Sequence, residues 1–330
     1  MRIDCHVHMV GNGLNGSGCR LFLRKALRKL MGRIMVQQLG MPGTILEGNL
    51  EEAYLQRVLE WRRGSSLTHI VLLAQDWVRD GNGNALENES ALYVPNDVVL
   101  KIGEEHSDIL PACSIHPARA DAIDELVRCH ERGAIMMKCL PLHHRIDPRD
   151  KRFEAFWRKM AELKMPLLAH TGGELSLPNN APELADPRIL IPVLEQGVTV
   201  IAAHGGSSAH YFDTNYMSET AEMLRKYPNL YVDNSGLNTP IRSRHLKRML
   251  GPEFAGRVIF GSDLPIAISP LWVRMRGWIS HAGYVRAKAE KNPIERDVII
   301  KQELGFPDET LTRLGGLLQT AAAQSTSPAR

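Results

Sequence analysis

Eight short apolar segments alternate with amphipathic segments along this chain of 330 residues, and the alternation predicts an α/β protein, a (β/α)8 barrel of the TIM type. Buried parallel strands form near-continuous apolar runs, and helices between such runs build right-handed βαβ units. The length also fits, because this barrel needs about 250 residues and tolerates insertions. We therefore expect one domain over residues 1–320, with a helical insertion after the first strand at about 11–50 and a disordered tail at 321–330.

The expected elements follow the apolar pattern in chain order. The predicted strands cover residues 2–8, 68–75, 109–115, 134–140, 166–171, 198–204, 229–235 and 257–262. Amphipathic helices are predicted at 121–132, 152–164, 187–196, 218–227 and 242–250, and closing helices at 271–279, 293–304 and 308–319.

Two connections are longer than a barrel crossover requires. About sixty residues separate the first two strands, and within them residues 21–39 (LFLRKALRKLMGRIMVQQL) predict a basic amphipathic helix that Gly32 interrupts. We expect this helix to pack over the barrel mouth as a lid or in an oligomer contact; a membrane-surface helix is the alternative. The polar loop at 79–97 follows the second strand and is expected to border the site.

Composition excludes several classes of protein. The net charge of +3 is too small to indicate a nucleic-acid partner, and no apolar run approaches the ~20 residues of a membrane span. Five widely spaced cysteines without a Cys-x-x-Cys motif predict free thiols in a reducing compartment. The first residues do not resemble a signal peptide, so we expect a cytoplasmic protein.

The first predicted strand carries two histidines with alternating spacing. Residues two apart point to the same face of a strand, so His6 and His8 should project together. By the same rule Cys5 should point to the opposite face, and it is not counted as a ligand. Two neighbouring imidazoles at the end of a strand form half of a metal site.

Other potential metal ligands end the later strands. Lys138 lies on the fourth strand, His170 ends the fifth, His204 ends the sixth and Asp263 follows the eighth. The carboxyl ends of all barrel strands converge on one pocket, so these side chains should meet the two N-terminal histidines. Imidazole and carboxylate ligands without thiolate suit Zn²⁺, Mn²⁺, Fe²⁺ or Co²⁺. A divalent metal lowers the pKa of bound water from about 15.7 towards about 7, and Asp263 is placed to take the proton.

These motifs together resemble the amidohydrolase superfamily, in its amidohydrolase-related branch called family 2. The resemblance runs from DCHVH at residues 4–8 to FGSDLP at 260–265, with a lysine, a histidine and a histidine in order between them. It implies that His6, His8 and Asp263 hold one metal, with zinc as the expected ion. It implies that His170 binds the same metal or a second one. His204 is then either a ligand of the second metal or a catalytic group that contacts the substrate.

The resemblance leaves more than one role open for Lys138. In members with two metals, a lysine on the fourth strand carries a carbamate that bridges them. Alternatively Lys138 is a free cation that orients an anionic substrate, or it is exposed near the rim.

The expected activity is that of a metal-dependent hydrolase whose activated water attacks an amide, lactone or ester carbonyl of a small molecule, with Asp263 and His204 as the catalytic residues. The alternative is a metal-dependent, non-oxidative decarboxylase of an aromatic or enoic acid, and a non-catalytic binding barrel is the third hypothesis. We expect no nucleic-acid partner and no membrane span, and a homo-oligomer is compatible with the fold. The substrate itself is not determined by these motifs.

Overall fold

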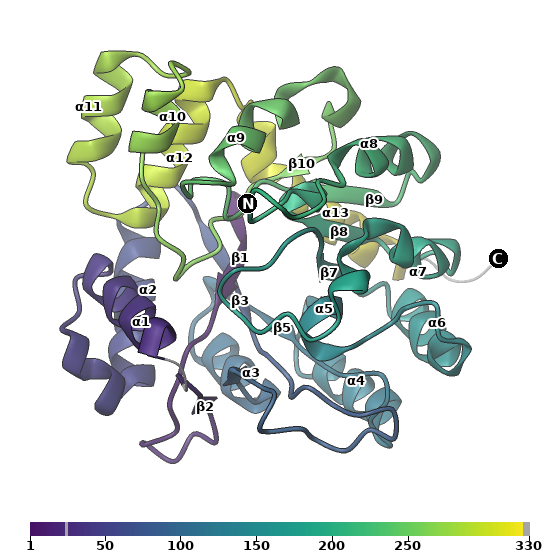
Figure 1. Ribbon diagram of the computed structural model, residues 1–330. Helices are drawn as coiled ribbons and strands as arrows, with labels where there is room; N and C mark the ends of the chain where they lie inside the picture. Colours follow the sequence, from purple (N-terminus) through teal and green to yellow (C-terminus); the bar gives the residue numbers. More distant parts are fainter. Residues whose placement is uncertain (24–25, 326–330) are drawn as a thin grey trace.

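The computed structural model describes residues 1–23 and 26–325, and its centre is a barrel of eight parallel strands surrounded by helices (Figure 1). The strands follow one another around the barrel in chain order, and two further short strands, β2 (Arg20–Leu21) and β4 (Leu92–Tyr93), form a separate two-stranded sheet. The predicted (β/α)8 architecture is confirmed, and all eight predicted strands are present.

The barrel strands are β1 (Ile3–His8), β3 (His69–Leu73), β5 (Ile109–Cys113), β6 (Met136–Cys139), β7 (Leu167–His170), β8 (Val200–Ala203), β9 (Leu230–Asp233) and β10 (Val258–Ile259). The helices are α1 (Ala26–Gln38), α2 (Leu50–Arg63), α3 (Asn96–Glu105), α4 (Ala122–Glu131), α5 (Pro141–His144), α6 (Glu154–Glu162), α7 (Ile191–Glu195), α8 (Met217–Lys226), α9 (Ser243–Leu246), α10 (Leu271–Met275), α11 (His281–Ala289), α12 (Pro293–Leu304) and α13 (Glu309–Ser325). Helices α2, α3, α5 and α11 are additional to those predicted. In the part of the chain that the structure describes, no helix is both long and apolar enough to cross a membrane.

The last strand and the chain after it close the barrel against β1. The Cys5 amide donates to the Phe260 carbonyl at 3.0 Å, and the His8 amide donates to the Leu264 carbonyl at 2.8 Å. Between them the Asp263 amide donates to the His6 carbonyl at 2.8 Å. This closure brings the chain following the eighth strand alongside the N-terminal histidines, although 257 positions separate His6 from Asp263 in the sequence.

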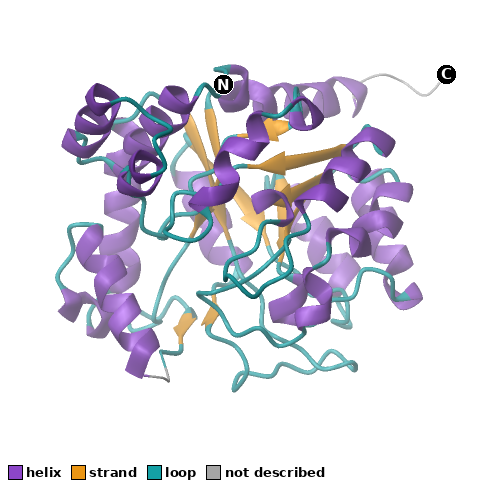
Figure 2. Cartoon of the chain, turned by 45° about the horizontal axis from the view of Figure 1, so that its top comes forward, coloured by secondary structure: helices purple, strands orange, loops and turns teal. Residues whose placement is uncertain are grey.

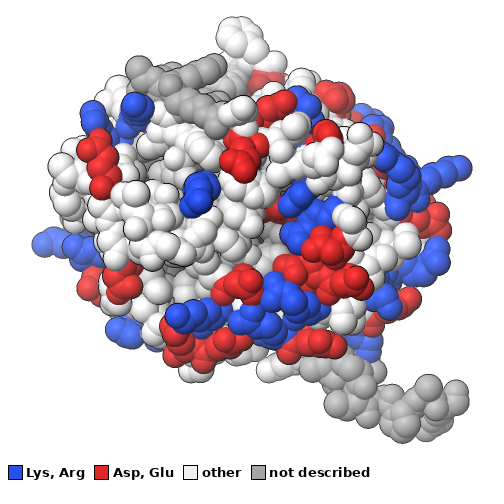
Figure 3. All heavy atoms as spheres, turned by 90° about the horizontal axis from the view of Figure 1, so that it is seen from below, with Lys and Arg blue, Asp and Glu red and all other residues white. Residues whose placement is uncertain are grey.

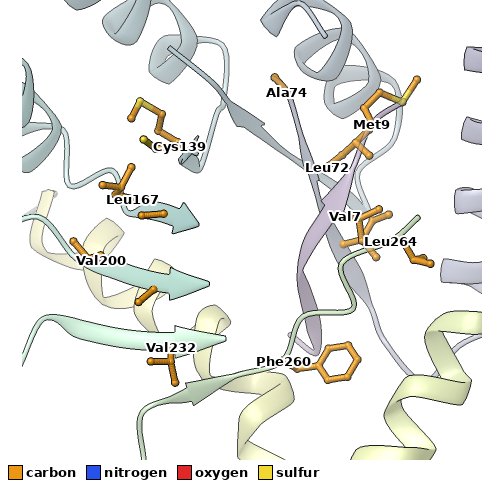
Figure 4. Close-up of a cluster of buried hydrophobic side chains, with 14 of the residues drawn as sticks. Val7, Met9, Leu72, Ala74, Cys139, Leu167, Val200, Val232, Phe260 and Leu264 are labelled. Carbon is orange, nitrogen blue, oxygen red and sulfur yellow. The ribbon is translucent and has the colours of Figure 1, made fainter. Parts of the chain in front are cut away.

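Two apolar layers hold the strands in place. The inner layer fills the barrel with one or two side chains from most strands, among them Val71, Met136, Leu168 and Ile201. The outer layer lies between the strands and the helices, and Figure 4 shows part of it, including Val7, Leu72 and Val232. Figure 2 shows helices to the left and right of the strands and loops below them. A strand buried on both faces is apolar throughout, which explains why the apolar runs located the strands correctly.

The long connection after β1 is tied to the loop after β3. Strand β2 (Arg20–Leu21) pairs antiparallel with β4 (Leu92–Tyr93), so part of the predicted helix at 21–39 is a strand. Helix α1 begins at Ala26 and runs through Gly32 without the predicted interruption, while residues 24–25 of the predicted helix lie outside the described residues. A Cβ at Gly32 would lie 3.1 Å from the Leu23 side chain, so close packing there accounts for the glycine without a break.

Helix α13 extends further than predicted. It continues to Ser325, five residues into the segment for which we expected a disordered tail, and residues 326–330 lie outside the described part. Three consecutive alanines at 321–323 favour this continuation because alanine has the highest helix propensity.

A buried ion pair stabilises the strand end that precedes Asp263. The Lys301 ammonium donates to the Asp297 carboxylate at 2.6 Å and to the Gly261 carbonyl at 2.7 Å, and both side chains are buried. Lys301→Met should lower the free energy of unfolding by about 3–5 kcal/mol, because it leaves the Asp297 charge buried without its cation. Urea denaturation measures this change. The double variant Lys301→Met, Asp297→Leu should recover most of the loss, and a double variant as unstable as the single one would contradict the ion-pair explanation.

Candidate metal centre

Three side chains at the carboxyl end of the barrel converge with the geometry of metal ligands. One ligand atom each from His6, His8 and Asp263 lies within 4.8 Å of the other two. The Nε2 atoms of the two histidines are 3.2 Å apart, and the Asp263 Oδ1 lies 3.4 Å from His6 Nε2 and 3.5 Å from His8 Nε2. Such spacing allows one cation to contact all three atoms at the usual distances of about 2.0–2.2 Å.

Asp233, at the end of β9, orients His6. Its Oδ2 accepts from His6 Nδ1 at 2.7 Å, which leaves Nε2 without a proton and directed at His8 and Asp263. Its Oδ1 accepts from the His204 amide at 2.9 Å and from the Ser235 hydroxyl at 2.6 Å. Burial raises the pKa of Asp233, but His6 and these donors outweigh burial and hold it well below its ordinary value. Asp233 was not among the predicted site residues, although its place at a strand's carboxyl end was a usable signal.

Asp233→Asn is expected to weaken divalent-metal binding by about 10- to 100-fold, because the amide no longer fixes the His6 tautomer. Competition with a chromogenic zinc chelator measures the affinity. Asp308→Asn is the matched control, since the Asp308 side chain is 63% exposed and distant from the centre. Unchanged affinity in Asp233→Asn would show that Asp233 does not orient a metal ligand.

An irregularity in β1 changes which residues face the site. The pairing register with β3 shifts between Asp4 and Val7. Cys5 therefore lies beside His6 rather than on the opposite face, with its Sγ 3.8 Å from the Asp233 carboxylate. The predicted position of Cys5 is wrong because simple alternation fails at such a shift. Burial raises the pKa of the Cys5 thiol well above its ordinary value, so it remains protonated.

His8 and Asp263 are in the protonation states that a cation needs. Burial lowers the pKa of His8 to about 4, so its ring is neutral and able to act as a ligand. Burial raises the pKa of Asp263, but the neighbouring His6 and His8 rings outweigh burial and hold this pKa below its ordinary value. The carboxylate therefore stays ionised.

Two residues of the site have left-handed backbone conformations. The φ angles are 61° at His204 and 68° at Asp263, a region that costs energy for most residues and often marks functional positions. Gly236 makes room for both side chains, because a Cβ there would lie 2.5 Å from Asp263 Oδ2 and 3.3 Å from His204 Nδ1. His204 Nδ1 lies 2.8 Å from the Ser235 carbonyl, which accepts its proton and leaves Nε2 free.

His170 lies next to these groups but makes different contacts. Its ring centroid is 4.8 Å from that of His204, and its Nε2 donates to the Gly173 carbonyl at 3.0 Å. Its Nδ1 lies 3.6 Å from the buried Glu174 carboxylate, a residue that was not predicted. Burial lowers the pKa of His170 to about 4. The ligand roles predicted for His170 and His204 stay predictions.

Lys138 lies beneath the two N-terminal histidines. It is 1% exposed, which excludes the exposed position near the rim, and its Nζ lies 3.0 Å from His6 Nε2. Burial lowers the pKa of Lys138, although the Asp233 and Asp263 carboxylates act in the opposite direction. The lysine thus contacts the same nitrogen that faces His8 and Asp263.

A deep cavity opens beside the three ligands. It comprises about 1130 Å³ of space, part of which is open solvent, and is bordered by His8, His170, His204 and Asp263. Residues of α1 and of the segment before it also border it, so the long connection after β1 forms a wall of this cavity. On the face shown in Figure 3, Lys and Arg side chains are interspersed with Asp and Glu, next to a broad uncharged surface.

Comparison with known proteins gives one family match and several structural likenesses. The family described as Amidohydrolase matches residues 3–285. An uncharacterised TIM-barrel protein from Bordetella bronchiseptica aligns with a TM-score of 0.61 at 18% identity, covering 98% of this chain and 99% of that one. A candidate 2-pyrone-4,6-dicarboxylic acid hydrolase from Pseudomonas putida aligns with a TM-score of 0.56 at 15% identity, covering 96% of this chain and 97% of that one. A 5-carboxyvanillate decarboxylase from Sphingomonas paucimobilis aligns with a TM-score of 0.52 at 12% identity, covering 98% of this chain and 97% of that one. At these identities the likenesses show the shared fold. The search of curated proteins found no match.

Proposed function

This chain belongs to the amidohydrolase family and is an enzyme, and from that premise we propose a metal-dependent hydrolase that acts on an amide, lactone or ester carbonyl of a small molecule. One observation carries the proposal: two imidazoles and a carboxylate, those of His6, His8 and Asp263, present ligand atoms within 4.8 Å of one another beside a cavity.

The three ligands suit zinc, and Mn²⁺, Fe²⁺ or Co²⁺ are compatible with the same atoms. When bound, a divalent cation supplies Lewis-acid polarisation of the carbonyl and lowers the pKa of water. The hydrogen bond from His6 to Asp233 supports this proposal, because metal-binding histidines usually donate their other ring nitrogen to a carboxylate or carbonyl.

Asp263 is the proposed general base and acid. It is ionised, it borders the cavity, and its second oxygen lies next to Gly236. It would accept a proton from the attacking water and return it to the leaving group. His204 also borders the cavity, and we propose that its free Nε2 contacts the oxygen of the substrate carbonyl.

Lys138 retains two proposed roles. Its lowered pKa increases the fraction of neutral amine, which is the form that reacts with carbon dioxide to give a bridging carbamate. As a cation it would instead hold the negative charge that develops near His6. Native mass spectrometry distinguishes the two roles by the added mass of one carbon dioxide, and metal content distinguishes two ions per chain from one.

Decarboxylation is the alternative activity, and the cavity argues against it. A substrate acid would bring further negative charge beside Glu174 and Asp263, while no Lys or Arg borders the cavity among the side chains that the structure describes. Hydrolysis of a neutral carbonyl compound avoids this repulsion.

The test compares zinc-loaded and chelator-treated protein on two sets of compounds. We expect 4-nitrophenyl hexanoate and related esters, lactones and amides to be hydrolysed, with activity lost on chelation and restored by zinc. Hydroxybenzoic acids should release no carbon dioxide. Carbon dioxide release, or hydrolysis that chelation leaves unchanged, would overturn the proposal.

A further inference from the structure

We propose that Tyr54 and Gln75 bind the substrate, and that this substrate is a neutral, mainly apolar molecule with a second hydrogen-bonding group beyond the reacting carbonyl. The inference rests on the proposed function, since it assigns a substrate class to the same site. It starts from two buried polar side chains that border the cavity and have no hydrogen-bond partner among the residues that the structure describes.

Most of the cavity wall is apolar. The segment before α1, helix α1 itself and the residues after it contribute aliphatic side chains, and others come from around the barrel mouth. The apolar wall is formed by Leu21, Met35, Val36, Leu39, Leu46 and Leu50, together with residues such as Leu140 and Ile266 nearer the barrel. Burying apolar substrate surface against this wall favours binding. A substrate with an extended hydrocarbon part therefore fits the space.

The charges around the cavity select against anions. Glu174 and Asp263 both border it, and both side chains end in a carboxyl group. Lys138 does not reach it, because its ammonium is buried against His6. Arg242 is not part of the cavity wall, and its guanidinium donates to the Gly173 carbonyl. A cation in the metal centre would be the main positive charge that borders the cavity. The reacting carbonyl of the substrate would face this cation.

Tyr54 extends into the cavity from α2. Asn49 caps this helix by accepting from the Glu52 amide, so the backbone of the first turn is held in place. Tyr54 is 1% exposed, and its hydroxyl has no hydrogen-bond partner within residues 1–23 and 26–325. Burial raises the pKa of Tyr54, so the hydroxyl remains a donor. Tyr54 and Asp263 border the same cavity.

Gln75 borders the cavity from the end of the second barrel strand. Its backbone is held by two hydrogen bonds with Val94, from Gln75 N at 3.1 Å and to Gln75 O at 2.8 Å. Gln75 is 1% exposed, yet in the described part of the chain neither its amide nitrogen nor its amide oxygen has a hydrogen-bond partner. A fixed amide of this kind offers a substrate both a donor and an acceptor.

Unpartnered buried polar groups disfavour folding, so a hydrophobic residue at either position would suit the free protein better. Polar side chains at both positions, bordering one cavity with a candidate metal centre, indicate that their partner is the substrate. Other buried unpartnered groups among the described residues, such as Trp157 Nε1, do not border this cavity.

The test uses Tyr54→Phe and Gln75→Leu in zinc-loaded protein. Both variants should unfold at the same urea concentration as the wild type or a higher one. For N-hexanoyl homoserine lactone, which carries an amide beside its lactone, kcat/KM should fall about 10- to 100-fold in at least one variant. For γ-nonalactone, which lacks the amide, the same variants should change kcat/KM less than threefold. Tyr227→Phe is the matched control, since Tyr227 lies on the far end of α8 and should leave both rates unchanged.

A second pair of compounds tests the charge preference. The wild type should hydrolyse 4-nitrophenyl hexanoate at least about 10-fold faster than the equally long mono-4-nitrophenyl adipate, which ends in a carboxylate. Equal rates, a preference for the adipate, or variants that leave both lactones unaffected would overturn this inference while the hydrolase proposal stands. Absence of zinc-dependent hydrolysis of every compound would instead overturn the hydrolase proposal.

Discussion

His6→Ala and His8→Ala are each expected to lose the bound metal and to lower kcat/KM by about 10³-fold or more. Each substitution removes one of three ligand atoms that lie within 4.8 Å of one another, and two remaining ligands hold a cation weakly. Without the cation, the pKa of the attacking water returns towards about 15.7, which accounts for the size of the effect. Elemental analysis of the purified protein and hydrolysis assays at saturating zinc measure the two quantities.

His281→Ala is the matched control, because His281 is exposed at the start of α11 and far from the barrel mouth. It should retain full metal content and activity. Far-ultraviolet circular dichroism should show that all three variants are folded. Full metal content in His6→Ala and His8→Ala would mean that these histidines do not form the metal centre.

Asp263→Asn is expected to lower kcat by about 10²- to 10⁴-fold, the usual contribution of a general base and acid. Asparagine keeps the size of the side chain and one oxygen, but it cannot accept the proton. It also tolerates the left-handed backbone at this position, where φ is 68°, so the variant should fold.

Metal content separates the two roles of Asp263. Where Asp263→Asn retains metal, the loss of kcat reports proton transfer; where metal is lost, added zinc at high concentration should restore binding before the assay. A kcat within threefold of the wild type in the metal-loaded variant would exclude Asp263 as the base. Asp308→Asn serves again as an exposed aspartate control.

Several features of the site follow from local sequence. The apolar runs locate all eight barrel strands, because burial on both faces imposes hydrophobic residues at nearly every position. The carboxyl ends of parallel barrel strands lie on one side of the barrel. The positions of His6, His8 and Asp263 at such strand ends were therefore sufficient to predict that these side chains meet. Met136 and Lys138 share a face by strand alternation, and Lys138 does point inward.

Other features depend on contacts between distant segments. The register shift in β1 turns Cys5 towards Asp233, and no local pattern predicts such a shift, because it depends on pairing with β3. Strand β2 pairs with β4, which follows β3 in the chain. Gly32 lies within α1 and packs closely against Leu23, so it is not a helix break.

By itself the sequence determined the barrel, the family and the side chains that could hold a metal, because these depend on residue type and on periodic patterns along one strand. Only the tertiary structure decided what surrounds them. Asp233 becomes a partner of His6 through the closure of the barrel, and Tyr54 and Gln75 become cavity residues through the packing of α2 and the end of β3. The physical reason is that a hydrogen-bond partner, or its absence, is a property of atoms brought together from distant segments, and the pattern within one segment does not contain it.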